Sequence, residues 1–260
     1  MPAISSEQMR KVDRLAIRDA GLSLPQLMEN AGHSLARVVD AYLQRGSPAE
    51  SGAAPQSSEE ARHKPILVLA GNGGNGGGAL AAARHLRNWG QPVQVALSAP
   101  PGNLSEATAQ QLRTLHKDGL RALWPAAPEF DARFPEWLQE ASLVVDGLIG
   151  YGLRGPLQGD PAVLVEAVLD RAPPVVVSLD VPSGFDASSG AGAASGVVAT
   201  ATVTLALPKT GLLQGDAAAA VGELLLADLG IPVYIYERLD IGGVRGLFAS
   251  GPIQHLVDEE

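Results

Sequence analysis

The chain of 260 residues contains no cysteine. This absence excludes disulfide bonds, thiolate catalysis and cysteine-ligated zinc, and it favours a cytoplasmic location. The 5 histidines lie far apart and show no metal-ligand spacing, so we expect no transition-metal site. Lys and Arg number 19 against 28 Asp and Glu, and this net charge of −9 argues against non-specific binding of nucleic acid.

Long apolar runs are also missing. No segment approaches the roughly 18–20 apolar residues of a membrane span, so we expect no membrane contact. The opening MPAISSEQMRKVD has no apolar core of a signal peptide. Hydrophobic residues still make up 46% of the chain, which predicts a globular protein with a sizeable core. We expect a single domain over residues 1–260.

From Pro65 onward, short apolar runs alternate with helical stretches. The apolar runs have no polar alternation, which is typical of strands buried on both faces. The pattern predicts a doubly wound, mostly parallel α/β sheet with helices on both sides. Strands are predicted at 66–70, 93–97, 143–145, 175–181, 200–208 and 223–232, and helices at 79–89, 103–117 and 160–170.

Two helices are predicted before this alternating region. Ser5 and Gln8 have the spacing of a capping box and begin the first helix, and the second follows Pro25. Residues 46–64 are polar and rich in Gly, Pro, Ala and Ser, which predicts a flexible surface insertion without chemistry. The segment after Pro232 has no clear pattern.

The sequence GNGGNGGG at 71–78 lies between a predicted strand and a predicted helix. Its glycines let the backbone approach a phosphate, and the free N–H groups of a helix N-terminus attract anions. The segment matches G-x-G-x-x-G, but no acid follows the second strand to hold a ribose, which disfavours an ordinary dehydrogenase. No Gly-Lys-Ser/Thr follows either, which disfavours a Walker loop.

Three further polar groups follow predicted strands. Asp146 and Asp180 each end a strand and lead into a Gly- or Pro-containing turn, and Lys209 follows the strand at 200–208. Ligands of parallel sheets bind beyond the carboxyl ends of the strands, so these groups and the glycine segment are expected to share a crevice. The alternative is that each aspartate only caps its turn through Asx-type hydrogen bonds.

Taken together, these segments resemble the YjeF N-terminal domain family, whose enzymes are NAD(P)H-hydrate epimerases. The similarity covers nearly the whole chain, and its motifs occur in the family's order. The segments are SSEQMRKVDRLAI (5–17), LMENAG (27–32), GNGGNGGGALAAARHL (71–86), VVDGLIGYGLRGP (144–156), SLDVPSGFDASSG (178–190), ALPKTGLLQG (206–215) and ADLGIP (227–232).

The resemblance implies a Rossmann-like three-layer α/β/α sandwich that forms a homodimer. It also implies isomerase activity, namely interconversion of the R and S epimers at C6 of hydrated NADH or NADPH (NADHX and NADPHX), so that a separate dehydratase partner can repair them. A potassium ion is implied beside the site.

Carried over by position, the family's motifs imply which residues form the site. Asn75, Asp146 and Ser183 would hold the potassium ion. Asp180 would contact the substrate ring and handle protons, with Lys209 orienting it or stabilising charge. The remaining substrate-binding residues would be Gly74, Asn75, Gly76, Gly77, Gly78, Gly150, Tyr151, Gly152, Leu153, Arg154, Gly155 and Pro156.

The glycine segment departs from the family's G-x-G-N-N-G-G-D-G. Gly74 stands where the family has its first Asn, Gly78 where it has Asp, and Ala79 where it has Gly. Gly74 lacks an amide that could bind ligand, and Gly78 lacks a carboxylate near a helix N-terminus. Two alternatives therefore stay open on the same fold: a nucleotide-binding domain without catalysis, and a dimerisation or scaffold domain.

Overall fold

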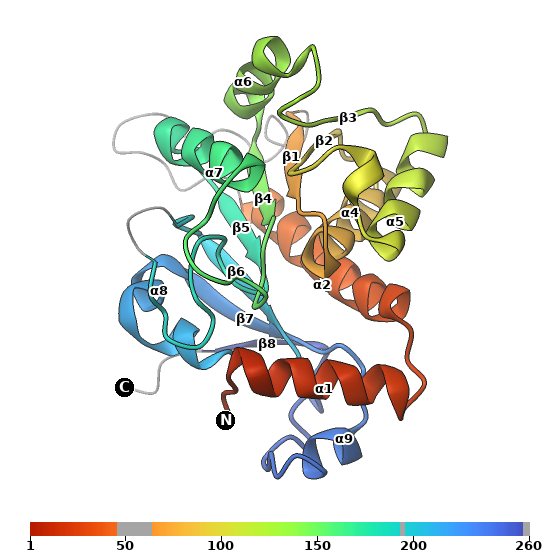
Figure 1. The fold of residues 1–260 in the computed structure, drawn as a ribbon, viewed down its shortest axis with the longest axis vertical. Coiled ribbons are helices and arrows are strands. Elements are labelled where there is room, and N and C mark those ends of the chain that lie inside the picture. Colours follow the sequence, from red (N-terminus) through yellow and green to blue (C-terminus); the bar gives the residue numbers. More distant parts are fainter. Residues whose placement is uncertain (46–63, 193–195, 257–260) are drawn as a thin grey trace.

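The computed structural model describes residues 1–45, 64–192 and 196–256. The predicted insertion at 46–64 lies outside the described residues, apart from Lys64. Within the described ranges, no helix combines the length and the apolar character that crossing a membrane requires. These ranges contain one sheet with helices packed on both of its faces (Figure 1).

The sheet has eight strands in the order β3-β2-β1-β4-β5-β6-β7-β8. All neighbouring pairs are parallel except β7–β8, which is antiparallel. The mostly parallel, doubly wound sheet predicted from the sequence is confirmed. The strands are β1 (Ile66–Ala70), β2 (Val93–Leu97), β3 (Ala122–Leu123), β4 (Leu143–Gly147), β5 (Val176–Leu179), β6 (Ala201–Leu205), β7 (Glu223–Ala227) and β8 (Ile253–His255).

Helices complete the three layers. In the described part of the chain they are α1 (Ser6–Arg18), α2 (Leu24–Arg45), α4 (Gly74–Asn88), α5 (Glu106–Lys117), α6 (Phe130–Glu140), α7 (Asp160–Arg171), α8 (Gly215–Ala220) and α9 (Val233–Glu237), with short 3₁₀ turns at Pro101–Asn103 and Thr210–Leu213. The capping box predicted at Ser5 and Gln8 is present and begins α1.

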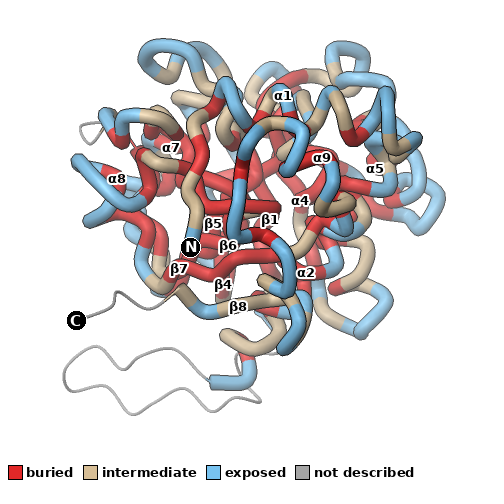
Figure 2. Tube along the Cα trace, turned by 90° about the horizontal axis from the view of Figure 1, so that it is seen from below, coloured by how far each residue is buried: buried red, intermediate tan, exposed pale blue. Residues whose placement is uncertain are grey.

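Alternation along each strand divides the core between the two faces of the sheet. Ile66 and Val68 of β1 pack with α2, α4 and α5, whereas Leu67 and Leu69 pack with α6 and α7. Helices therefore shield both faces of the sheet from water, and the strands form the buried centre of the molecule (Figure 2). A further apolar cluster joins α1 and α9 beyond the carboxyl ends of β6 and β7.

Several predicted boundaries were wrong. The sequence did not reveal β3, α6, α8, α9 or β8; α6 contains Pro135, which obscures its helical pattern. Helix α4 begins at Gly74, five residues before the predicted start at 79, so most of the glycine segment is the first part of a helix. Strands β5 and β6 end early because Asp180 (φ 69°) and Ala206 (φ 64°) take left-handed backbone conformations.

Helices α2 and α4 approach each other closely through glycine. A Cβ atom on Gly32 would lie 2.6 Å from Cβ of Ala81 and 2.6 Å from the carbonyl oxygen of Gly78. Such contacts are shorter than van der Waals distances, and one partner is backbone, so the helices would have to move apart. This close approach fixes the position of the α4 N-terminus against the rest of the fold.

We predict that Gly32→Ala lowers the free energy of unfolding by about 1–2 kcal/mol, because overpacking outweighs the gain in helix propensity. Urea denaturation measures the difference. Gly102→Ala is the matched control, since a Cβ atom there would meet nothing within 4 Å. Equal stability of the two variants would contradict the tight helix contact.

Candidate functional site

A cavity of about 760 Å³ opens at the carboxyl ends of β1, β4, β5 and β6. This is where ligands bind to open parallel sheets, and the volume suits a ligand of nucleotide size. Its walls come from the start of α4, the segment after β4, the ends of β5 and β6, and helices α1 and α2. Chain segments that are far apart in sequence thus meet around one space.

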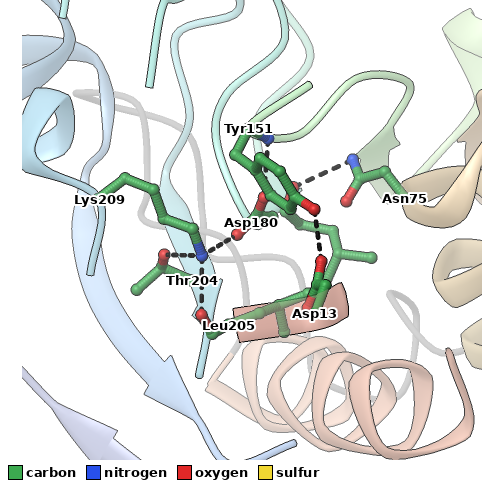
Figure 3. A network of polar contacts seen from close by, with 8 residues as sticks. Asp13, Asn75, Tyr151, Asp180, Thr204, Leu205 and Lys209 are labelled. Carbon is green, nitrogen blue, oxygen red and sulfur yellow. Dashed lines mark hydrogen bonds and ion pairs between the residues drawn. The ribbon is translucent and has the colours of Figure 1, made fainter. Parts of the chain in front are cut away.

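A buried ion pair lies on one wall of the cavity. Lys209 Nζ contacts Asp180 Oδ1, and the lysine side chain is fully buried while that of Asp180 is 4% exposed. Lys209 Nζ also donates to the carbonyl oxygen of Leu205 at 2.7 Å and lies 3.5 Å from Thr204 Oγ1 (Figure 3). Three acceptors hold the ammonium, as is needed for a buried charge.

Two similar tight turns set up this ion pair. Asp180 follows β5 with φ 69°, and the N–H of Val181 donates across it to the carbonyl oxygen of Leu179 at 2.9 Å. Ala206 follows the adjacent β6 with φ 64°, and the N–H of Leu207 donates to the carbonyl oxygen of Leu205 at 2.7 Å. Left-handed backbone of this kind costs energy in residues other than glycine. The turn ends β5 and places the Asp180 carboxylate in contact with Lys209 and the N–H of Tyr151.

Tyr151 links Asp180 to helix α1. Its backbone N–H donates to Asp180 Oδ2 at 2.8 Å, and its hydroxyl donates to Asp13 Oδ2 (Figure 3). Burial raises the pKa of Asp13 above its usual range, against the effect of the Tyr151 hydroxyl. Burial and the nearby Asp13 carboxylate raise the pKa of the Tyr151 hydroxyl. Tyr151 is therefore a neutral hydrogen-bond donor at physiological pH.

Asp146 and Ser183 form a separate group outside the cavity lining. Asp146 Oδ1 accepts hydrogen bonds from Ser183 Oγ at 2.6 Å and Leu148 N at 3.3 Å. Its Oδ2 accepts from Ser183 N at 2.8 Å and from Ser178 Oγ at 2.9 Å. Burial raises the pKa of Asp146, and these four hydrogen bonds oppose that shift. The Asx-type interaction considered from the sequence is therefore present, through Leu148.

Asn75, in the first turn of α4, lines the cavity. Its Nδ2 donates to the carbonyl oxygen of Leu179 at 3.2 Å, which ties α4 to the turn at Asp180. Its Oδ1 lies beside Gly150, where a Cβ atom would come within 3.1 Å of it and within 2.5 Å of Asp180 Oδ2. Gly150 therefore leaves room for these oxygens.

The predicted substrate residues divide into two sets. The cavity is lined by Gly74, Asn75, Gly150, Tyr151, Gly152, Leu153, Arg154, Pro156, Asp180 and Lys209. Gly76, Gly77, Gly78 and Gly155, also predicted to bind substrate, do not line the cavity. Gly77 and Gly78 instead face the packing of α4 on its neighbours: a Cβ atom on Gly77 would meet Met28, and one on Gly78 would meet Leu179.

The two glycines that depart from the family pattern, Gly74 and Gly78, are therefore not equivalent. Gly78 is the fifth residue of α4, and a Cβ atom on it would point at Leu179 Cδ2, 3.0 Å away. A Cβ atom on Gly74 would meet nothing within 4 Å, and Gly74 lines the cavity. Only the change at Gly74 removes a side chain from the open space of the site.

Sequence reasoning missed the contribution of α1 and α2. Met9, Arg10 and Asp13 of α1 line the cavity, together with Leu27 and Met28 of α2. The available signal was Asp13, an acid next to the apolar stripe of α1 and thus on the side of the helix that faces the protein. Nothing in the spacing indicated which strand end this face would meet.

The profile of the family described as YjeF-related protein N-terminus matches residues 24–211. An NAD(P)H-hydrate epimerase of Dehalogenimonas lykanthroporepellens is 41% identical over 97% of this chain and 91% of its own length. A bifunctional NAD(P)H-hydrate repair enzyme Nnr of Moorella thermoacetica is 33% identical over 89% of this chain, but the match covers 41% of that longer protein.

The fold also has a close counterpart among solved structures. The crystal structure of yeast ynu0 superposes with a TM-score of 0.77 and 24% identity, over 98% of this chain and 100% of the yeast chain. At this identity the likeness concerns the fold, and it extends beyond the 24–211 segment. Helix α1 and the segment after β6 are thus part of a shared architecture.

We predict that Lys209→Met lowers the free energy of unfolding by about 3–5 kcal/mol, because it leaves a buried Asp180 charge without a partner. Chemical denaturation at neutral pH measures this loss. Adding Asp180→Asn should recover part of the stability, since the unpaired charge is then gone. Lys11→Met is the control, because Lys11 is 51% exposed and its surface pair with Glu7 contributes little. A loss no larger than that of the control would contradict the role given to the pair.

Proposed function

We propose that this chain, which belongs to the YjeF-related protein N-terminus family, is an NAD(P)H-hydrate epimerase. It interconverts the R and S epimers at C6 of NADHX and NADPHX. The observation that carries the proposal is Asp180, a buried carboxylate facing a nucleotide-sized cavity with both oxygens held in place, by Lys209 and by the Tyr151 N–H.

The reaction needs little more than controlled proton transfer in a dry pocket. C6 of the hydrated ring carries a hydroxyl next to the ring nitrogen, whose lone pair can expel that hydroxyl as water and leave an iminium ion. Water then returns to the opposite face, and the proton it loses restores the starting protonation. In this proposal the proton that leaves with the hydroxyl is delivered through Asp180 from the Asp180–Lys209 pair. Asp180 then takes up the proton that the returning water loses, so the pair regains its starting protonation. Asp180 suits both transfers because it lies in the cavity and its orientation is fixed.

Lys209 supports this role without direct proton transfer to substrate. Its ammonium already donates to Leu205 O as well as contacting Asp180, so it serves to orient the carboxylate and to balance its charge. The N–H groups at the start of α4, near Gly74 and Asn75, lie along the cavity and suit the diphosphate of the ligand.

We propose that a potassium ion binds beside this site, held by Asn75, Asp146 and Ser183. All three residues offer oxygen, which suits a hard cation. Asn75 lines the cavity, and the buried Asp146 carboxylate accepts its four hydrogen bonds in the described residues from neutral donors. A bound cation would supply positive charge next to that carboxylate and the ligand diphosphate.

The remaining sequence-based expectations stay predictions. The family resemblance predicts a homodimer and a separate dehydratase that consumes the product. The lack of cysteine predicts a cytoplasmic location. The Moorella relative is more than twice as long as the matched segment and is named bifunctional, which supports a second activity working with this one.

We predict that Asp180→Asn lowers the rate of epimerisation by roughly 10²-fold or more, the usual contribution of a positioned acid or base. Chromatography of purified R and S NADPHX measures the rate. Thermal shifts with NADPHX check that the variant still binds. Asp216→Asn is the control, because Asp216 is exposed at the start of α8. Unchanged turnover in Asp180→Asn would rule out its role, and binding without turnover in the unmodified protein would favour the non-catalytic alternative.

We predict that potassium chloride raises the melting temperature above that in choline chloride at equal ionic strength. A ligand at 100 times its dissociation constant stabilises by about 2.7 kcal/mol, which is several degrees for a chain of this size. Asn75→Ala should reduce the difference. Identical melting in the two salts would contradict the proposed cation.

A further inference from the structure

Asp13 of helix α1 is linked by hydrogen bonds to the ion pair of the site. Asp13 Oδ2 accepts the hydroxyl proton of Tyr151, and the backbone N–H of the same Tyr151 donates to Asp180 Oδ2 at 2.8 Å (Figure 3). Tyr151 thus connects two carboxylates that lie more than 160 residues apart in sequence. Asp13, Tyr151 and Asp180 all line the cavity.

Two cationic side chains lie near the ring of Tyr151. The guanidinium carbon of Arg10 lies 5.8 Å from the ring centroid, and Lys209 Nζ lies 5.9 Å from it. These distances allow cation–π attraction, but this attraction does not determine the direction in which the Tyr151 hydroxyl points. Within the described residues, the hydroxyl has one hydrogen-bond partner, Asp13, and this bond gives the ring its direction.

The chain just before α1 is attached to the other member of the ion pair. Ile4 N donates to Pro208 O at 2.9 Å, and Thr210 N donates to Ile4 O at 3.0 Å, so Ile4 pairs with the backbone on both sides of Lys209. Ile4 is buried, with 1% of its surface exposed. The N-terminal segment therefore holds Lys209 at one point and Tyr151 at another.

We propose that Asp13 is a positioning residue for the epimerisation, acting through Tyr151 on the carboxylate of Asp180. This inference rests on the proposed function. Asp13 accepts the Tyr151 hydroxyl, which fixes the residue whose N–H orients Asp180 Oδ2. The titratable groups near Asp13 are Tyr151, Asp180 and Lys209 across the cavity and Tyr236 on α9, and Arg10 of its own helix lies beside the Tyr151 ring.

The test compares Asp13→Ala, Tyr151→Phe and the double variant by kcat and KM with purified NADPHX. Each single variant should lower kcat about tenfold, and the double variant no further than the worse single variant, because the two residues act as one unit. Asp13→Asn keeps an acceptor for the hydroxyl, so it should keep kcat within about threefold of the unmodified protein. Glu7→Gln, on the exposed face of α1, is the matched control and should leave kcat unchanged.

Three results would overturn the proposal. The losses of the single variants could multiply in the double variant, Asp13→Asn could be as impaired as Asp13→Ala, or kcat could stay normal while only stability falls. The last result would assign Asp13 a structural role alone. An unmodified protein that does not epimerise NADPHX would instead refute the proposed function, a distinct outcome because it appears before any variant is compared.

Discussion

The ion pair between Lys209 and Asp180 is the contact on which the site depends. A buried ammonium and a buried carboxylate are each costly to remove from water, so each must be supplied with partners. Those partners come from the end of β6, through Thr204 and Leu205, and from the segment after β4, through the N–H of Tyr151. Satisfying one buried pair therefore brings the ends of β4, β5 and β6 together, and the backbone hydrogen bonds of Ile4 attach the N-terminal segment on both sides of Lys209.

The glycine segment has a different meaning in the structure than in the sequence. It forms the first turns of α4, and its inner glycines let α4 pack closely on α2 and β5. Gly74 and Asn75 remain at the cavity, whereas Gly77 and Gly78 contribute to packing. These eight residues thus allow α4 to pack closely on its neighbours and leave the N-terminus of α4 open to the cavity.

The sequence predicted the parts of this molecule that follow from local pattern. Apolar runs located β1, β2 and β4 closely, and polar residues at strand ends pointed to Asp180 and Lys209. It did not reveal the left-handed turn at Asp180, because the apolar run predicted as a strand extends through 181 and no glycine marks the bend. Nor did it reveal Asp13 beside Tyr151, since that contact depends on how α1 lies across the sheet. Which distant segments pack against each other depends on the tertiary structure, and the spacing of residues in the sequence does not predict it.

The family profile begins at residue 24 and ends at 211, yet the cavity uses residues on both sides of these limits. Arg10 and Asp13 precede the matched segment, and Leu229 follows it. A fragment cut at the profile boundaries would lose one wall of the binding site and would leave the apolar surface of Leu27 and Ala31 exposed to water. The segment that the family profile matches is thus smaller than the segment that forms the complete ligand-binding surface.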